Sequence, residues 1–182
     1  TQTRLCNMVR LSNLCRTLAM RLLMLVVLML PILSFGSEEN KRFFEEQQVL
    51  AEQGEANAQN KLALMYSTGL GVLKDEKEAV KWYRKAADQG HADAQYKLGL
   101  MYGNGTGVPK DYKEAAKWYR LAADQGHAKA QFILGGMYKD GRGVPEDDKE
   151  AVKWYRLAAD QGFSRAQYKL GLMYGNGTGV PK

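Results

Sequence analysis

A repeat of 36 residues constrains the fold of this chain more than any other feature of its sequence. Tryptophan recurs at this spacing as Trp82, Trp118 and Trp154, and glycines and leucines recur in the same register. The units at residues 91–126 and 127–162 match at 26 of 36 positions without an insertion. A period of this length indicates small supersecondary units that bury a continuous core only when they stack on one another.

The repeat predicts how the chain is organised. We expect a leader at residues 1–36, an N-terminal capping helix at 37–54, whole units at 55–90, 91–126 and 127–162, and a partial unit at 163–182. The capping helix is expected because its apolar side chains have helical spacing and it ends in AEQG, which imitates the AADQG of each unit. Since the chain begins at Thr1 and ends within a unit, we expect a longer protein and treat the repeat count as a lower limit.

Each unit predicts a pair of helices. In the second unit, Ala94, Leu98 and Met101 form the apolar stripe of a first helix over roughly residues 92–102. Gly99 lies in the middle of this helix, where glycine costs about 1 kcal/mol relative to alanine. The equivalent positions of the other units also hold glycine or alanine, so we predict a close approach between two helices there.

The second helix of the unit carries signals at both of its ends. Asp111 and Glu114 form an Asp-x-x-Glu start, in which the aspartate caps free backbone N–H groups and the glutamate reaches back. Gly126 supplies the left-handed residue that favours the end of a helix. In the first unit Trp82 and Tyr83 lie on one side of the equivalent helix, which predicts an amphipathic helix with its aromatic residues inward.

The leader resembles a targeting segment. From Met20, the predicted start, a positive residue precedes the twelve-residue run at 22–33, which is apolar except for Pro31. A membrane-spanning helix needs about 20 apolar residues, so the run is short for a span. It predicts a signal peptide cleaved after Gly36 and a periplasmic or secreted protein. The alternative is that the leader is not cleaved and that residues 22–33 anchor the protein in a membrane. We expect no other contact with a membrane.

Charge and cysteine content narrow the function classes. The net charge is +6, but the leader holds four arginines and no acidic residue, so the rest has 22 basic and 20 acidic residues, or +2. A nearly neutral protein lacks the electrostatic footprint of a nucleic-acid-binding protein. Both cysteines, Cys6 and Cys15, lie in the leader, so we expect no disulfide and no thiolate site in the repeats.

The glycine-rich stretch Gly103–Lys110 could be a phosphate cradle or a turn. A P-loop needs a preceding strand and a Gly-Lys-Ser/Thr sequence that enters a helix. Here a predicted helix precedes the glycines, Val108 and Pro109 separate them from Lys110, and no serine or threonine follows the lysine. We therefore predict a turn and no bound cofactor.

Two histidines and a basic aromatic stretch are further candidate sites. His91 and His127 are equivalent residues one unit apart, too far to share a metal easily, so we predict residues at helix starts rather than metal ligands. The Lys-Trp-Tyr-Arg stretch Lys81–Arg84 could stack on single-stranded nucleic acid, but its rings lie on the predicted buried side, which favours core packing with a solvated basic edge. No Ser-His-Asp set can be assembled, so we predict no catalytic, cofactor or metal site.

The pattern AQYKLGLMY…KWYR-x-AADQG, over residues 55–182, resembles the Sel-one-like repeat, a relative of the tetratricopeptide repeat. The resemblance implies an all-α fold, a right-handed α/α-solenoid of antiparallel helix pairs. It also implies an adaptor that holds protein partners in secreted, periplasmic or membrane-associated complexes. Ala63 and Leu73 depart from the pattern, where they replace a helix glycine and a loop proline.

The expected function is a non-catalytic, exported scaffold that binds protein partners on a solenoid surface. Exported family members with paired cysteines are associated with β-lactams, which leaves a β-lactamase-like or cell-wall-ligand-binding protein as the alternative; this chain lacks those cysteines. A structural spacer is a third possibility. If a binding face exists, we expect it at four equivalent, mostly aromatic positions, for which packing between repeats is the competing interpretation: Asn60, Tyr96, Phe132 and Tyr168.

Overall fold

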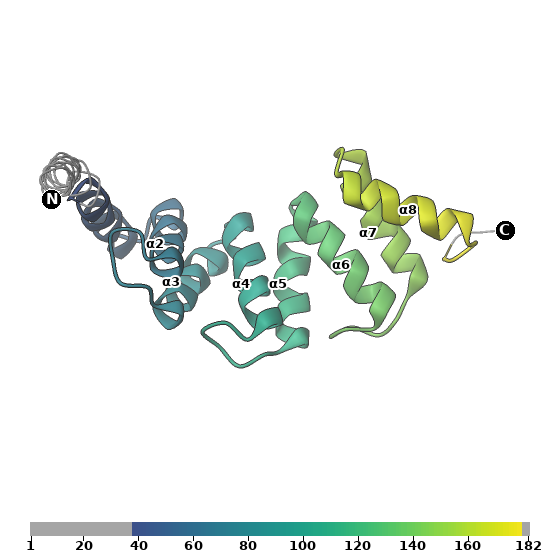
Figure 1. Cartoon of the computed structure of the whole chain (residues 1–182), viewed down its shortest axis with the longest axis horizontal. Coiled ribbons are helices and arrows are strands. Elements are labelled where there is room, and N and C mark those ends of the chain that lie inside the picture. The colour runs from purple at the N-terminus through teal and green to yellow at the C-terminus, as the bar shows by residue number, and fades with distance from the viewer. Residues whose placement is uncertain (1–37, 180–182) are drawn as a thin grey trace, which may run out of the picture.

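The computed structural model describes residues 38–179 as a row of helices without a strand in that range (Figure 1). The predicted leader lies outside the described residues. A helix at 38–52 is followed by α2 (Ala56–Thr68), α3 (Glu76–Asp88), α4 (Ala92–Asn104), α5 (Tyr112–Asp124), α6 (Ala128–Asp140), α7 (Asp148–Asp160) and α8 (Ser164–Gly175).

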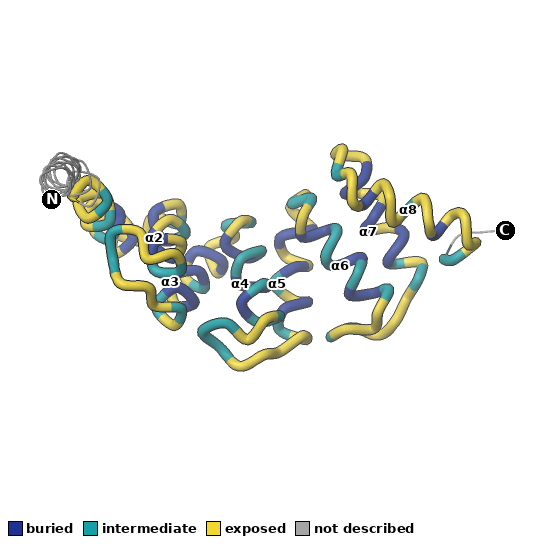
Figure 2. Tube along the Cα trace, in the orientation of Figure 1, coloured by how far each residue is buried: buried dark blue, intermediate teal, exposed yellow. Residues whose placement is uncertain are grey.

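The helices stack in the order in which they occur in the chain. The main contacts join consecutive helices, both within the pairs α2–α3, α4–α5 and α6–α7 and between one pair and the next. Buried residues lie where successive helices meet, while the connecting loops are largely exposed (Figure 2). This arrangement confirms the predicted all-α solenoid.

The core of each unit combines a leucine of the first helix with a tyrosine of the second. In the second unit, Leu98 is fully buried and Tyr119 is buried. The Tyr119 ring lies directly against Gly99, where an ideal Cβ atom would be 2.8 Å from Tyr119 Cδ1. Tyr155 lies against Gly135 in the same way. The predicted close approach of two helices at the small residue is therefore confirmed.

The aspartate cap forms as predicted, but the glutamate has a different role. Asp111 Oδ1 accepts hydrogen bonds from the backbone N–H of Lys113 at 2.8 Å and of Glu114 at 3.1 Å. The prediction that Glu114 reaches back is wrong, because the Asp111 N–H donates instead to the carbonyl of Tyr102 at 2.9 Å. Glu114 forms an ion pair with Lys117, one turn further along α5. The cap thus joins the two helices of the unit.

Glycines shape both the helix ends and the loops. Gly126 has φ +85° and ends α5, as predicted. In the loop before α5, Gly105 and Gly107 have φ +74° and +70°, which confirms the turn geometry expected for this stretch. Gly107 also touches the preceding unit, since an ideal Cβ atom there would be 2.4 Å from the carbonyl oxygen of Glu76, the first residue of α3. The loop is therefore packed against its neighbour.

Candidate functional site

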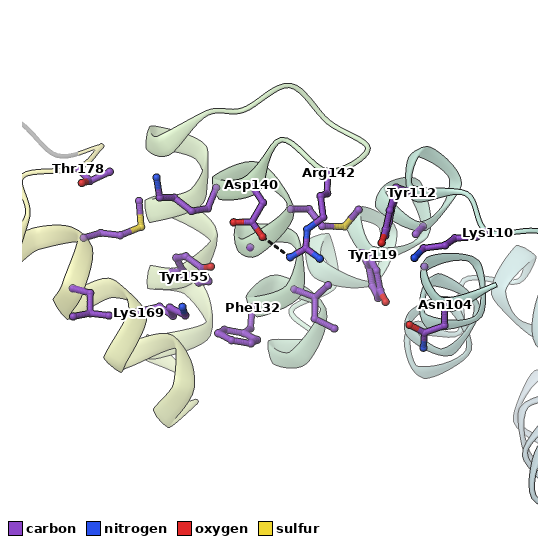
Figure 3. A pocket seen from close by; sticks show the side chains of 18 of the residues that line it. Asn104, Lys110, Tyr112, Tyr119, Phe132, Asp140, Arg142, Tyr155, Lys169 and Thr178 are labelled. Carbon is purple, nitrogen blue, oxygen red and sulfur yellow. Dashed lines mark hydrogen bonds and ion pairs between the residues drawn. The ribbon is translucent and has the colours of Figure 1, made fainter. Parts of the chain in front are cut away.

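A cavity of about 560 Å³ lies among α4, α5, α6, α7 and α8, and we call it the α6 hollow (Figure 3). Helix α6 supplies the largest share of its lining: Phe132, Ile133, Gly136, Met137, Lys139 and Asp140. The hollow is within the range of volumes that ligand pockets occupy, about 300–1,000 Å³. Three successive units therefore contribute to one concave surface.

Buried aromatic rings and one glycine give the α6 hollow its depth. Tyr119 and Tyr155, which are buried, contribute to its lining from α5 and α7. Burial raises the pKa of both phenols above the ordinary value, so they are neutral near pH 7. Gly136 lies beside the second ring, since an ideal Cβ atom there would be 3.4 Å from the Tyr155 hydroxyl oxygen. The missing side chain at Gly136 leaves this part of the hollow open.

Cationic side chains surround the apolar surface. Arg142 stands between Gly141 and Gly143, whose positive φ values turn the loop, and it forms an ion pair with Asp140. Figure 3 shows Arg142 between Asp140 and Tyr112, and the Lys110 side chain on the far side of Tyr112. The lining includes the cations Lys110, Lys139, Arg142 and Lys169 but, within the described part of the chain, only one carboxylate, that of Asp140.

Two cationic side chains act on Tyr112 at this rim. Lys110 Nζ lies 4.7 Å from the centre of the Tyr112 ring. Hydrogen bonding to Lys110 lowers the pKa of the exposed Tyr112 hydroxyl, and Arg142 adds to the effect. Positive neighbours favour the charged form of an acid, so a lowered pKa is the sign expected for a cationic surface.

The four predicted partner-binding residues lie one unit apart and do not form a single cluster. Tyr96 stacks on His127, with ring centres 4.6 Å apart, and Phe132 packs on Phe163 at 5.2 Å. Phe132 lines the α6 hollow, and Tyr96 and Phe132 together line a second, more open hollow of about 610 Å³.

The ends of this set differ from its middle. Asn60 is half-buried on α2, whereas Tyr168 on α8 is 66% exposed. Tyr96 and Phe132 each contact a tyrosine of their own unit, Tyr119 or Tyr155, as well as the first residue of the following unit. These contacts are the packing between helices and units that competes with partner binding as an interpretation. Contact of any of the four with a partner stays a prediction.

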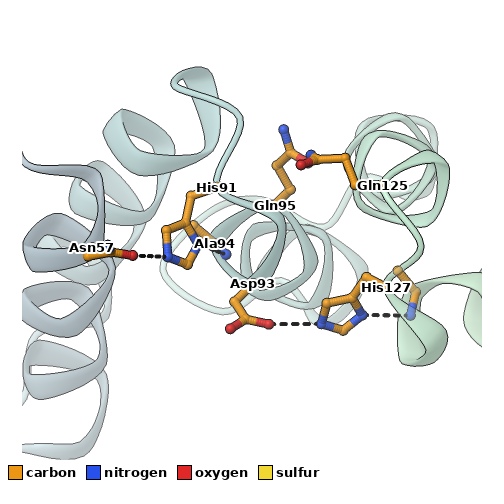
Figure 4. A network of polar contacts seen from close by, with 8 residues as sticks. Asn57, His91, Asp93, Ala94, Gln95, Gln125 and His127 are labelled. Atoms are coloured by element: carbon orange, nitrogen blue, oxygen red, sulfur yellow. Dashed lines mark hydrogen bonds and ion pairs between the residues drawn. The ribbon is translucent and has the colours of Figure 1, made fainter.

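The histidines cap helices and join units (Figure 4). His127 Nδ1 accepts a hydrogen bond from the Ala130 N–H at 3.2 Å, and its Nε2 lies 3.0 Å from Asp93 Oδ1 in the preceding unit. His91 makes the same cap and contacts Asn57 at 3.0 Å. The prediction that both histidines lie at helix starts is confirmed. The sequence did not predict their contacts with the preceding unit. Over residues 38–179, no group of three or more histidine, cysteine, aspartate or glutamate side chains could hold a metal.

The Lys-Trp-Tyr-Arg stretch packs as core and also links units. Tyr83 is buried and Trp82 half-buried, which confirms the predicted core packing. The basic edge is less solvated than expected in the first unit, because Arg84 is half-buried. Arg84 donates a hydrogen bond to the Tyr102 hydroxyl and lies 5.8 Å from the centre of the Trp118 ring, both in the next unit.

No helix in the described range 38–179 is long and apolar enough to cross a membrane. The apolar run at residues 22–33, which raised the question of an anchor, lies outside that range.

Several solved structures are similar to this chain. A protective antigen of uropathogenic Escherichia coli with an SLR fold is 47% identical with a TM-score of 0.73, and the match covers 75% of this chain and 29% of that chain. A Sel1 repeat protein from Oxalobacter formigenes is 43% identical with a TM-score of 0.70, over 76% of this chain and 55% of that chain. This chain thus matches well under two thirds of either protein.

A more distant structure shows the fold alone. Cysteine rich protein B of Helicobacter pylori is 24% identical with a TM-score of 0.60, over 74% of this chain and 96% of that chain. No curated protein sequence matches the chain significantly. The model of the Sel1 repeat matches residues 56–91, 92–127, 128–163 and 164–182, each range starting one residue after a predicted unit. With four consecutive repeats over more than half of its length, the chain belongs to the Sel1 repeat family.

Proposed function

We propose that this protein is a non-catalytic scaffold, exported from the cytoplasm, that binds protein partners on its solenoid surface. The observation that carries the proposal is the α6 hollow, an open apolar and cationic surface to which three successive units contribute. Solenoids of the Sel1 type commonly mediate protein–protein interaction. Because stacked units extend one surface over many residues, such a fold suits a long or irregular partner better than a small substrate.

Export is part of the same proposal. The predicted signal peptide at residues 1–36 supports it, and so does the absence of cysteine from the sequence after Cys15, which leaves the repeats independent of the redox state of the compartment. Cell fractionation and N-terminal sequencing of the mature protein test this part. A protein retained in the cytoplasm with its leader intact would contradict export.

Site-specific crosslinking tests the binding surface. A photo-crosslinking amino acid is placed at Ile133, in the α6 hollow, or at Leu121, an exposed residue of α5 outside it, in the complete protein expressed in its own cell. We expect covalent adducts with one or a few proteins from Ile133 and not from Leu121. The absence of adducts at Ile133, or equal adducts at both positions, would contradict binding at this surface. Hydrolysis of a chromogenic β-lactam by the purified protein would contradict the non-catalytic assignment.

A further inference from the structure

The second and third units are identical at 26 of 36 positions, and most of the positions where they differ lie around one surface. They differ at ten positions. At eight of these, one or both of the two residues line the α6 hollow: Tyr96/Phe132, Lys97/Ile133, Leu100/Gly136, Gly103/Lys139, Asn104/Asp140, Thr106/Arg142, Lys110/Glu146 and Tyr112/Asp148. The other two are Asp93/Lys129 and Ala116/Val152.

Solvent exposure alone does not explain this pattern. Helices α5 and α7 expose several side chains that are identical between the two units, including Lys113/Lys149, Leu121/Leu157 and Asp124/Asp160. These exposed surfaces tolerate substitution as readily as a hollow does, because a change there rarely alters stability by more than about 0.5 kcal/mol. The differences concentrate where three units meet, which indicates a surface with a requirement of its own.

The substitutions in α6 change the hollow in a consistent direction. Gly136 occupies a position that is leucine in the other units, Leu64, Leu100 and Leu172, so the third unit alone lacks a side chain there. About one helical turn before Gly136 in α6, Ile133 stands where the second unit has Lys97. Together these two changes make the middle of the hollow both deeper and more apolar than the equivalent place in the second unit.

The rim of the hollow combines two new ion pairs with two lysines that have no carboxylate partner among the described residues. Lys139 and Arg142 replace Gly103 and Thr106 of the second unit, while Asp148 and Asp140 replace Tyr112 and Asn104 and form ion pairs with them. Arg142 is paired with Asp140, but both side chains are about half exposed, so exchange of this partner for another carboxylate costs little. Among residues 38–179, no carboxylate lies within ion-pairing distance of Lys110 or Lys169, two further lining cations.

We propose that the α6 hollow binds an acidic, extended segment of a partner protein, with one bulky apolar side chain seated at Gly136 and carboxylates on either side of it. The proposal rests on the proposed function and specifies the chemistry of the partner. In Figure 3, Lys169 lies on one side of the site and Arg142 and Lys110 on the other, with Phe132 between them. An apolar side chain in the middle and carboxylates at its flanks match this order of apolar and positive groups.

A peptide array tests the chemistry of the partner with the complete protein. The array holds nine-residue peptides in which the central residue takes all twenty identities, and the four residues around it are all glutamate, all glutamine or all lysine. We expect binding to the glutamate series when the central residue is leucine, isoleucine, phenylalanine or methionine, and binding that weakens with added salt. Binding that is equal in the glutamine series, or absent from the glutamate series, would overturn the proposal.

Variants taken from the sister unit locate the site without introducing residues foreign to the fold. Gly136→Leu restores the leucine of the second unit and fills the hollow, and Lys110→Glu introduces the glutamate of the third unit at the rim. We expect each to weaken binding of the best peptide, labelled with fluorescein, by about tenfold or more, which corresponds to about 1.4 kcal/mol. Circular dichroism and the urea midpoint show whether each variant remains folded.

The control for charge is Lys113→Glu on α5, an exposed position that lines neither the α6 hollow nor the second hollow. It changes the net charge by the same amount as Lys110→Glu, and we expect unchanged peptide binding. An equal loss in both variants would reduce the interaction to overall charge and overturn the site. If crosslinked partners are found at Ile133 but their adducts map to neutral or basic segments, the proposed scaffold function stands and this inference fails.

Discussion

At the scale of single residues, the glycines of the repeat fall into two kinds. Gly126 has φ +85°, a left-handed conformation, and nothing lies within 4 Å of an ideal Cβ atom there. Gly107 has a similar angle, but the same construction places Cβ 2.4 Å from the backbone oxygen of Glu76. The first kind satisfies only a backbone angle, whereas the second also lets a loop touch the helix of the preceding unit.

This difference predicts unequal effects of the same substitution. Gly126→Ala is expected to lower the free energy of unfolding by about 1–2 kcal/mol, the cost of the left-handed conformation. Gly107→Ala carries that cost and also forces the loop away from Glu76, so its loss is expected to reach about 2–5 kcal/mol. Urea unfolding of the two variants measures both values. Equal losses of unfolding free energy would show that the loop can move away from Glu76 and that the contact at Gly107 does not stabilise the protein.

Gly99 gives a prediction of the opposite kind, because the first unit already contains the substitution. Ala63 stands at the equivalent position and is fully buried. Gly99→Ala gains about 1 kcal/mol of helix propensity and requires the Tyr119 ring to shift, so we expect a net change within about 1 kcal/mol. Gly99→Leu cannot be accommodated by a small shift and is expected to cost about 1–3 kcal/mol or more. Thermal unfolding of both variants tests this, and a large loss for the alanine variant would contradict it.

At the scale of helices, a row of glutamines connects the units. Gln95 is buried on α4, where its Nε2 donates to the Ala87 carbonyl at 3.0 Å and its Oε1 accepts from Gln125 at 2.8 Å. Figure 4 shows Gln95 and Gln125 side by side, in the same view as His91 and His127. Gln131 repeats both bonds one unit later. Each buried glutamine therefore hydrogen-bonds to a carbonyl at the end of the preceding unit's second helix and to a glutamine that follows the second helix of its own unit.

Removal of one glutamine tests the strength of this connection. Gln95→Leu removes one of the hydrogen bonds that the buried Ala87 carbonyl accepts, another coming from the Gly90 N–H, and it removes one acceptor of the exposed Gln125 amide. Each lost hydrogen bond is expected to cost about 0.5–1.5 kcal/mol. Gln167→Leu is the control, because Gln167 makes the same kind of bond to Ala159 but is exposed, so water replaces the lost contact. Urea unfolding should show a clear loss for the first variant and little change for the second. Similar values would mean that water reaches Gln95 as well.

The sequence predicted the elements more completely than the contacts between them. The period, the aspartate caps and the terminal glycines each depend on a few neighbouring residues, and they are present as expected. The bonds from Arg84 to Tyr102, from Gln125 to Gln95 and from His127 to Asp93 join residues 18, 30 and 34 apart. A period of 36 identifies residues that are equivalent in different units, but it does not identify which non-equivalent residues meet when the units stack.

At the scale of the whole molecule, the same limitation explains why the α6 hollow was not predicted. The expected binding positions, Asn60, Tyr96, Phe132 and Tyr168, are equivalent residues of successive units. The hollow depends on residues that break the equivalence, above all Gly136 and Arg142, and on three units that meet around α6. A comparison of the second and third units does find the variable positions, but stacking is needed to show that most of them face one surface.

The buried tyrosines of the units act together on stability at high pH. Burial raises the pKa of Tyr83, Tyr119 and Tyr155 above the ordinary value of 10.0. An acid with a raised folded-state pKa keeps its proton in the folded protein after it has lost it in the unfolded chain. The stability contributed by these groups is therefore fully present below about pH 10 and is lost as the pH rises through the higher folded-state values. Because the tyrosines recur in successive units, the effect extends along the solenoid.

Phenylalanine substitutions isolate this contribution from the titration of lysines. In the double variant Tyr119→Phe and Tyr155→Phe, two of the ionising groups are removed, so the urea midpoint should fall less steeply above pH 10 than in the unmodified protein. Tyr112→Phe is the control with the opposite sign, because Lys110 and Arg142 lower the pKa of Tyr112. Ionisation of Tyr112 favours the folded state, so its removal should make the alkaline loss steeper. If the urea midpoint fell with pH in the same way in the unmodified protein and in both variants, the prediction would be wrong. Ionisation of these tyrosines would then not contribute to the loss of stability at high pH.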